Sequence, residues 1–327
     1  MDSETTLNRR EALIKLLRVA GAGAGTAGLG IWLNARSQSP EVSLAISAKR
    51  AHSVPADPSL PEMAIVQGDD PALLARQAIE DLGGVRRFIG RGDVVLVKPN
   101  IGWDRTPEQA ANTNPDVIAE IVRQSLDAGA KKVIVTDVSC NEPRRCFQRS
   151  GIAEAAQRAG AEVILPDPSK FKEVDLGGEV LRLWPVFEPF LNADKVVNVP
   201  IAKHHGLTGC TLGMKNWYGM LGGQRNQLHQ KIHESLVDLA DFIRPTLTIT
   251  DCYRVLMRNG PTGGNLEDVL LKKTLVASTD PVAVDAYVAK AVWNLEVDDL
   301  PYLRMAAKRG LGTFDFEKLR TQVKQLS

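Results

Sequence analysis

Four of the five histidines of this chain lie within residues 201–233, together with lysines, amides and closely spaced glycines. Histidine and lysine side chains can exchange a proton near neutral pH when their surroundings adjust their pKa values. Lysine also holds negative charge, and glycine lets the backbone approach a ligand closely. The candidate catalytic residues of this segment are Lys203, His204 and Lys215. Its candidate ligand-binding residues are Gly209 and Asn216.

The remaining histidines of the segment have the spacing of metal ligands. His229 and His233 are four residues apart, so they share one face if this part of the chain is helical. Gln230 follows His229, which excludes the HExxH arrangement of zinc proteases. We expect His205, His229 and His233 to be candidate metal ligands, and a pair of surface histidines is the alternative left open.

Polar residues also close several of the expected strands. Because parallel strands point their carboxyl ends to the same edge of a sheet, these residues should meet at one rim. The rim would hold Lys98, Asn100, Asp137, Lys203, His204, His205 and Asp251. Such a set could bind an anionic substrate or a metal, or move protons. We take Asp251 as a catalytic candidate and Lys98, Asn100 and Asp137 as ligand-binding candidates. Each aspartate taken alone is more simply a helix cap or a loop acceptor.

Asp285 lies among apolar residues of an expected helix, so its carboxylate needs partners if it is buried. We include it among the ligand-binding candidates, with hydrogen bonding to a neighbouring loop as the alternative. The glycines of residues 206–223 match neither the dinucleotide nor the Walker fingerprint. The sequence therefore argues against an ATPase or an ordinary nicotinamide enzyme.

Strand and helix patterns alternate along the chain, which predicts an α/β fold with a mainly parallel, doubly wound sheet and helices on both faces. A Gly-Gly turn within residues 172–183 predicts a small β-hairpin insertion. The expected strands are 63–66, 93–100, 132–137, 162–165, 195–200, 247–251 and 275–278. The expected helices are 71–82, 115–128, 144–159, 232–243 and 281–293.

The N-terminus resembles an export signal. Arg9 and Arg10 precede an uncharged, Gly/Ala-rich run at residues 19–33, as in a twin-arginine signal. That run is too short for a confident membrane span. We expect residues 1–36 to be a twin-arginine-like signal or membrane anchor, with the translocation machinery as a partner and a periplasmic or extracytoplasmic location. A cytosolic amphipathic helix is the alternative, and cleavage of the signal is left open.

The remaining chain divides into two parts. Residues 37–61, rich in Ser, Ala and Pro, read as a linker, and residues 62–327 as a single α/β domain. Residues 1–36 hold five basic and three acidic residues, so the rest of this chain of net charge +1 carries −1. This near-neutral body has no electrostatic footprint for nucleic acid.

The cysteines exclude several kinds of site. None of the four forms a CxxC pair, which excludes the local signatures of zinc ribbons, ferredoxin clusters and thioredoxins. A disulfide between Cys140 and Cys146 is left open for an exported protein.

Several motifs together resemble the family called domain of unknown function 362, over roughly residues 60–310. They are Lys98-Pro99-Asn100; Lys203-His204 with Thr211-Leu-Gly213-x-Lys215-Asn216-x-x-Gly219; His229 with His233; Asp251; Gly260-Pro261-x-Gly263; and Ser278-x-Asp280-Pro281-Val282-Ala283-x-Asp285. The resemblance implies a bacterial or archaeal protein, frequently exported by the twin-arginine route. Many members carry a ferredoxin-like cysteine cluster, but this chain departs from them, and we expect no iron–sulfur cluster of its own.

A weaker similarity is to the nickel-pincer lactate racemase family, on His204 or His205, Gly209, Lys215 and His229. The Gly-Gly-Lys core of that family is not matched, because Gly213-Met214-Lys215 stands in its place. This similarity leaves a metal ion or a metal-containing cofactor open.

Two function classes follow from the sequence. The first is an exported enzyme that acts on a small anionic substrate at a Lys/His/Asp site. The second is a non-catalytic protein that binds a metal, cofactor or metabolite and associates with a membrane redox complex.

Overall fold

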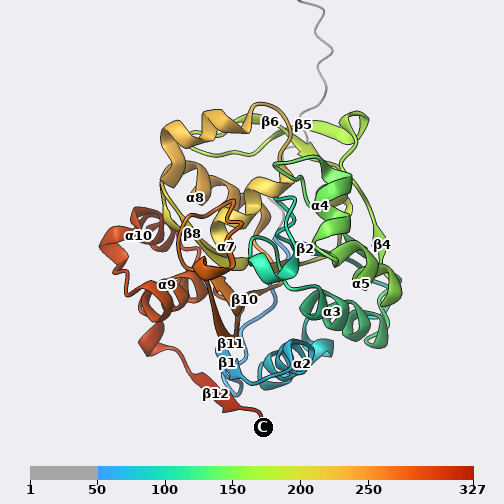
Figure 1. Ribbon diagram of the computed structural model, residues 1–327, viewed down its shortest axis with the longest axis vertical. Coiled ribbons are helices and arrows are strands. Elements are labelled where there is room, and N and C mark those ends of the chain that lie inside the picture. The colour runs from blue at the N-terminus through green and yellow to red at the C-terminus, as the bar shows by residue number, and fades with distance from the viewer. Residues whose placement is uncertain (1–50) are drawn as a thin grey trace, which may run out of the picture. The chain divides into compact units, whose positions relative to one another are not determined.

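The computed structural model describes residues 51–327 (Figure 1). The predicted signal at residues 1–36 and the first part of the predicted linker, residues 37–50, lie outside the described residues. Residues 51–61 contain no helix or strand. His52 within them is buried, and its backbone N–H donates to the carbonyl oxygen of Arg244 at 2.9 Å. This end of the predicted linker is therefore packed onto the domain.

A ten-stranded sheet forms the centre of the fold, with strands in the order β12-β1-β11-β10-β7-β2-β3-β4 and with β8 and β9 attached through β10. Its strands are β1 (Met63–Gln67), β2 (Val94–Pro99), β3 (Lys132–Val135), β4 (Glu162–Val163), β7 (Lys195–Val199), β8 (Ile201–His205), β9 (Gly209–Thr211), β10 (Leu247–Leu256), β11 (Val269–Ser278) and β12 (Thr321–Gln325). The pairs β10–β7, β7–β2, β2–β3 and β3–β4 are parallel, whereas β11 runs antiparallel to both of its neighbours. The expected mainly parallel sheet is confirmed.

Helices cover both faces of this sheet, as Figure 1 shows with α2–α5 on one side and α8–α10 on the other. On β2, Val95 and Val97 face one apolar core and Leu96 faces the other, because successive strand residues alternate between faces. The first core includes residues of α2, α3, α4 and α5, and the second includes residues of α8, α9 and α10. The helices are α2 (Pro71–Asp81), α3 (Pro115–Asp127), α4 (Pro143–Arg149), α5 (Ile152–Arg158), α6 (Pro189–Asn192), α7 (Gly213–Asn216), α8 (Ile232–Ile243), α9 (Pro281–Trp293) and α10 (Pro301–Lys308). The doubly wound arrangement is thus confirmed.

The starts of three helices follow from the same local chemistry. Asp70, Asn114 and Asp280 each precede a proline, and each side-chain oxygen accepts a backbone N–H from the first turn of α2, α3 or α9. A polar cap satisfies a donor that the helix leaves free, and proline at the first position loses no hydrogen bond. The sequence prediction of these three starts is confirmed.

Other elements differ from the prediction. The helix expected at residues 144–159 is divided into α4 and α5 at Gly151, whose φ of +73° interrupts the helical backbone. The hairpin exists as β5 (Phe171–Asp175) and β6 (Leu183–Phe187), so its second strand begins later than expected. The exposed strand β12 at the C-terminus was not predicted. Within residues 51–327, no helix has both the length and the apolar character needed to cross a membrane.

The largest difference lies in residues 201–211, for which no strand was expected. Pro200 ends β7, and the chain continues as β8, which pairs with the far end of β10. β8 then turns back into β9, with Lys203 opposite Thr211 and His205 opposite Gly209. The site residues here therefore stand on a strand pair, which fixes the face to which each side chain points.

Candidate functional site

A cavity of about 350 Å³ lies beside the carboxyl ends of β2 and β3, and β8, β9 and α7 form its opposite wall. Eight of the predicted site residues line it, namely Lys98, Asn100, Asp137, Lys203, His205, Lys215, Asn216 and His229. They come from sequence positions more than a hundred residues apart. Five of the seven residues expected at the rim of strand ends line this cavity, whereas His204 and Asp251 do not, and three lysines contribute to it.

Strand alternation separates the neighbouring histidines of β8. Lys203 and His205, two residues apart, both line the cavity. His204 lies between them and does not line it; its Nδ1 accepts the backbone N–H of Gly260 at 3.3 Å. His204 thus connects β8 to the loop that follows β10. It lies outside the cavity, although we expected it to be a catalytic residue.

Lys98 is a buried lysine whose Nζ makes two hydrogen bonds and one ion pair. Its Nζ lies 2.8 Å from Asp137 Oδ1, 2.8 Å from Asn216 Oδ1 and 2.8 Å from the carbonyl oxygen of Pro99. An ammonium group has three N–H donors, so none is left for a ligand. Burial lowers the pKa of Lys98, and the charge of Asp137 opposes that shift. Lys98 therefore acts as part of the cavity wall.

Gly219 lies directly against this ion pair. A Cβ at this position would be 1.7 Å from Asp137 Oδ1 and 2.6 Å from Lys98 Nζ. Both partners are buried, so neither can move aside into solvent. The close approach of the 3₁₀ turn Trp217–Met220 to the ion pair therefore requires glycine.

Lys203 is buried as well but keeps part of its bonding capacity. Its Nζ donates to Asn100 Oδ1 at 2.9 Å and to the carbonyl oxygen of Ala111 at 2.6 Å. Asn100 in turn donates to Asn216 Oδ1 at 3.0 Å, which links Lys203 to the Lys98 network. Burial lowers the pKa of Lys203 to about 7. This lysine can therefore both hold a negative charge and exchange a proton near neutral pH.

Lys215 on α7 has the least saturated amine of the three. It is 9 % exposed, and its Nζ has no hydrogen-bond acceptor or carboxylate among residues 51–327. The Nζ lies 4.9 Å from the centroid of the Tyr218 ring, a contact that favours the ammonium form. Desolvation outweighs that contact and lowers the pKa of Lys215 to about 8. Its amine is thus available to a bound molecule.

The two histidines of the cavity have complementary hydrogen-bonding roles. His205 Nδ1 accepts the backbone N–H of Leu207 at 3.2 Å, which places the proton of the neutral ring on Nε2. Burial lowers the pKa of His205 to about 3, so the ring stays neutral at physiological pH. His229 Nδ1 lies 3.3 Å from the carbonyl oxygen of Asn226 and must donate to it, which leaves Nε2 as an acceptor. The cavity therefore offers one neutral imidazole donor and one neutral imidazole acceptor.

The three histidines predicted as metal ligands do not meet. The rings of His205 and His229 are stacked with centroids 6.4 Å apart, whereas the His233 ring is stacked on Tyr302 at 6.3 Å and does not line the cavity. In the part of the chain that the structure describes, no three His, Cys, Asp or Glu side chains are grouped so that they could hold a metal ion. Of these two rings, only His229 has a nitrogen, Nε2, that is free to act as a ligand, because Nε2 of the neutral His205 ring carries its proton.

Asp251 and Asp285 are buried outside the cavity, where they cap backbone donors. Asp251 accepts the backbone N–H groups of Asn114 at 2.8 Å and Tyr253 at 2.9 Å, at the start of α3. Asp285 accepts those of Gly213 at 2.8 Å and Met214 at 3.0 Å, at the start of α7. Burial raises the pKa of Asp251 to about 6 and that of Asp285 to about 7. Both carboxylates position the elements around the cavity without reaching it.

Gly209 also lies outside the cavity. It begins β9 with a φ of +67°, and a Cβ there would approach Leu295 Cδ1 at 3.1 Å. Its position therefore serves the turn from β8 to β9 and the packing of that turn.

Sequence reasoning missed several residues of the cavity. Thr211 faces it from β9, and its buried Oγ1 has no hydrogen-bond partner among the described residues. Arg225 donates to the carbonyl oxygens of Val138, Ser139 and Tyr218 and adds a positive charge. The exposed thiol of Cys140 completes this group. The pairing of β8 with β9 places Thr211, whereas no sequence pattern marked Arg225.

All four cysteines are free thiols. Cys140 is exposed and Cys146 is buried on α4, so the disulfide left open by the sequence is not formed. Burial raises the pKa of Cys146 to about 11, which keeps that thiol protonated.

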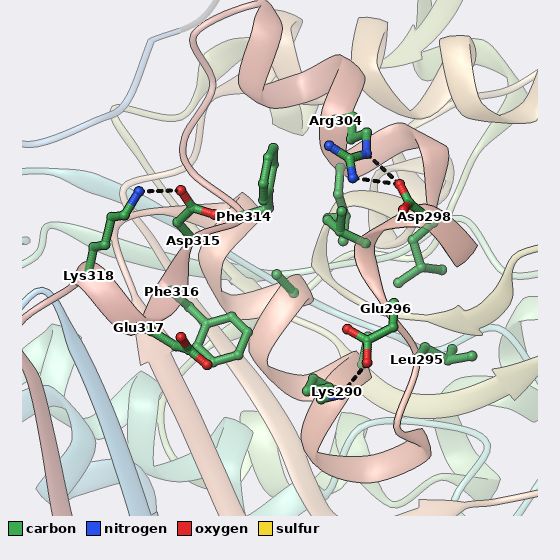
Figure 2. A pocket seen from close by; sticks show the side chains of 15 residues that line it. Lys290, Leu295, Glu296, Asp298, Arg304, Phe314, Asp315, Phe316, Glu317 and Lys318 are labelled. Carbon is green, nitrogen blue, oxygen red and sulfur yellow. Dashed lines mark hydrogen bonds and ion pairs between the residues drawn. The ribbon is translucent and has the colours of Figure 1, made fainter.

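A second cavity, of about 470 Å³, lies between α9, α10 and the segment around Phe316 (Figure 2). Its cations are paired with acids at its rim, Arg304 with Asp298 at 2.6 Å and Lys318 with Asp315 at 2.6 Å, and Lys290 with Glu296. None of the predicted site residues lines it. Although it is larger, it lacks the unpaired buried cations of the first cavity.

Several known proteins are similar to this chain in sequence or in structure. The thylakoid-associated protein sll1697 of Synechocystis sp. is 28% identical over 252 residues, which cover 72% of this chain and 74% of that protein. The lactate racemase apoprotein from Thermoanaerobacterium thermosaccharolyticum is 12% identical with a TM-score of 0.41, over 71% of this chain and 55% of that one. A Thermotoga maritima protein is 13% identical with a TM-score of 0.38, over 70% of this chain and 60% of that one.

The family is shown by a direct match. The family model described as domain of unknown function (DUF362) matches residues 95–290, which include every residue that lines the first cavity. This confirms the family resemblance read from the motifs. The chain belongs to the DUF362 family.

Proposed function

We propose that the cavity is the active site of an enzyme that binds a small organic anion and transfers protons on it. The observation that carries this proposal is the pair Lys203 and Lys215, two buried lysines with no carboxylate partner among the described residues, beside one cavity. Burying an amine without a counter-charge is costly, so such a pair suits a site whose counter-charge arrives with the ligand.

The chemistry of the neighbouring groups supports proton transfer. The lowered pKa values of about 7 for Lys203 and about 8 for Lys215 lie near the operating pH, where general acids and bases are most effective. His229 Nε2 can accept a proton, and His205 Nε2–H can donate a hydrogen bond to a developing negative charge. In this proposal Lys98, Asn100, Asp137 and Asn216 hold the lysines in place, while His204, Gly209, Asp251 and Asp285 act on the surrounding backbone.

A binding measurement tests the proposal. We expect small carboxylates such as acetate, propionate or pyruvate, or inorganic phosphate, to raise the melting temperature of the wild type. Lys203→Met should weaken that binding by about 10- to 100-fold, because a hydrogen bond to a charged group contributes roughly 1.5–3 kcal/mol. The matched control is Lys308→Met, because Lys308 is exposed and remote from the cavity. If none of these anions stabilises the wild type, the proposal is wrong.

The affinity for such an anion should fall as the pH rises. An anion binds best when Lys203 and Lys215 are protonated, and their pKa values of about 7 and about 8 lie below the usual lysine value because of desolvation. The dissociation constant should therefore be flat below about pH 7 and increase above it, by up to about tenfold per pH unit for each deprotonated lysine. Arg225, the Lys98–Asp137 pair, His205, His229 and the thiol of Cys140 also face the cavity. Isothermal titration calorimetry across this range measures the trend, and a pH-independent affinity would contradict it.

We propose that the chain is exported by the twin-arginine route and stays at the extracytoplasmic face of the membrane. The support is the Arg9-Arg10 signature and the thylakoid association named for the Synechocystis relative. Fractionation of cells that carry the wild type and an Arg9→Lys/Arg10→Lys variant tests this. A cytoplasmic location of the full-length wild type would oppose it.

A second candidate is binding without turnover, next to a membrane redox partner. The thylakoid association of the relative is the observation that favours it. His229 Nε2 could also bind a metal-containing cofactor with further ligands of its own, although no step proposed above uses one. Metal analysis of protein from its native export route, compared with a His205→Ala/His229→Ala variant, tests the cofactor, and turnover of a bound anion separates enzyme from binding protein.

A further inference from the structure

We propose that Lys215 forms an imine with the carbonyl group of a bound oxo acid. This inference rests on the proposed function and names its substrate class, an organic anion that also carries a ketone or an aldehyde. It starts from the different numbers of acceptors around the three lysines of the cavity. Among the described residues, Lys98 has two hydrogen-bond acceptors and the ion-paired carboxylate of Asp137, Lys203 has two acceptors, and Lys215 has none.

The different numbers of acceptors give the three amines different roles, as an ammonium group or as a free amine. Two acceptors and a carboxylate stabilise the Lys98 ammonium group, whereas two acceptors leave Lys203 one position toward a ligand. Lys215 is nine-tenths buried, and its Nζ lies 4.9 Å from the centroid of the Tyr218 ring. A lysine that is desolvated in this way loses its proton readily and becomes a nucleophile. Lys215 is therefore the amine that is suited to attack a carbonyl carbon.

The walls around Lys215 supply the other groups that imine formation needs. The Oγ1 of Thr211 is buried without a hydrogen-bond partner among residues 51–327 and lines the same cavity, so a polar ligand atom would satisfy it. The Nε2–H of His205 can donate to the carbonyl oxygen, and Nε2 of His229 can accept a proton. Lys203 remains to hold the carboxylate of the same molecule.

The step balances without an oxidant or a reductant. The lone pair of Lys215 Nζ forms a bond to the carbonyl carbon, and the carbonyl π electrons move to oxygen, which takes up a proton. The nitrogen releases a proton, for which His229 Nε2 is the acceptor. The hydroxyl group then leaves as water after a second protonation, and the nitrogen lone pair forms the C=N bond. The resulting iminium ion then releases its remaining N–H proton, so the nitrogen loses two protons in all, the oxygen gains two, and amine and carbonyl give imine and water.

Reductive trapping tests this inference on the full chain. The wild type is incubated with pyruvate and sodium cyanoborohydride, which reduces an imine to a stable secondary amine, and peptide mass spectrometry locates the adduct. We expect one adduct per chain, on Lys215, and its suppression by excess propionate, which has the same carboxylate but no carbonyl group. Lys215→Arg should abolish it, while Lys308→Met should leave it unchanged.

The outcomes separate this inference from the proposed function. An adduct on Lys203 or on exposed lysines, or no adduct, overturns the imine at Lys215 even if propionate and pyruvate still bind. If neither anion binds the wild type, the proposed function fails as well. Because the adduct is mapped on the wild-type protein, the test stands even if Lys215→Arg does not fold.

Discussion

Asp137→Ala is expected to lower the free energy of unfolding by about 3–5 kcal/mol, because it leaves the Lys98 ammonium group buried without its counter-charge. The two side chains are 0 % and 2 % exposed and lie 2.8 Å apart. In the variant, Lys98 can escape the penalty only by losing its proton. The unfolded state then binds more protons than the folded state. The loss of free energy of unfolding in Asp137→Ala should therefore shrink as the pH rises toward the ordinary pKa of lysine. Urea unfolding at several pH values measures it.

Two control variants distinguish a buried pair from a surface pair. Lys98→Met/Asp137→Leu removes both charges and should be less destabilised than Asp137→Ala, because no uncompensated charge remains. Glu154→Ala breaks the exposed pair with Arg158, whose side chains are 71% and 73% exposed, and should change stability by less than about 1 kcal/mol. An Asp137→Ala protein as stable as the Glu154→Ala protein would show that the buried pair does not hold this wall of the cavity.

Asp285→Ala is the second large effect, with an expected loss of about 2–4 kcal/mol. The variant removes the acceptor of two backbone N–H groups at the start of α7, and a buried donor without a partner costs roughly 1–3 kcal/mol. Asp285 is 0 % exposed, so water cannot replace its carboxylate without rearrangement. Because α7 carries Lys215 and Asn216, anion binding should weaken together with stability.

The pH dependence of this loss gives a second readout. Burial raises the pKa of Asp285 from 3.8 to about 7 in the folded protein, so the folded state keeps this proton while the unfolded state loses it. The stability that Asp285 contributes is therefore full below about pH 4 and declines as the pH rises to about 7. The deficit of Asp285→Ala in urea unfolding should be larger at about pH 5 than at about pH 8. Asp285→Asn keeps one acceptor oxygen, so its stability should lie between that of the wild type and that of Asp285→Ala. An Asp285→Ala protein as stable as the wild type would contradict the capping role.

The fold was predictable wherever local chemistry and long apolar runs agree. Asp70-Pro71, Asn114-Pro115 and Asp280-Pro281 each predicted a helix start that the structure confirms. The apolar run at 94–97 lies in the strand expected at 93–100, and Val95 and Leu96 lie in opposite cores. The strands β8, β9 and β12 were missed, because short polar strands take their structure from pairing partners distant in sequence.

For the site, the sequence determined which residues have suitable chemistry and that the ends of β2, β3 and β7 meet at one edge. It could not determine which of two adjacent histidines faces the cavity. The pairing of β8 with β10 and β9 decides that Lys203 and His205 point inward and His204 outward, because a strand alternates its side chains.

The sequence predicted that the histidine-rich segment at 201–233 forms one group of proton carriers and metal ligands. In the tertiary structure, the residues of this segment lie in separate environments. Its lysines stand in different environments although they are the same residue type: Lys203 has two acceptors and Lys215 has none among the described residues. Sequence sets the intrinsic chemistry of a side chain, but desolvation and hydrogen-bond partners set its pKa, and both depend on atoms that only the folded chain brings together.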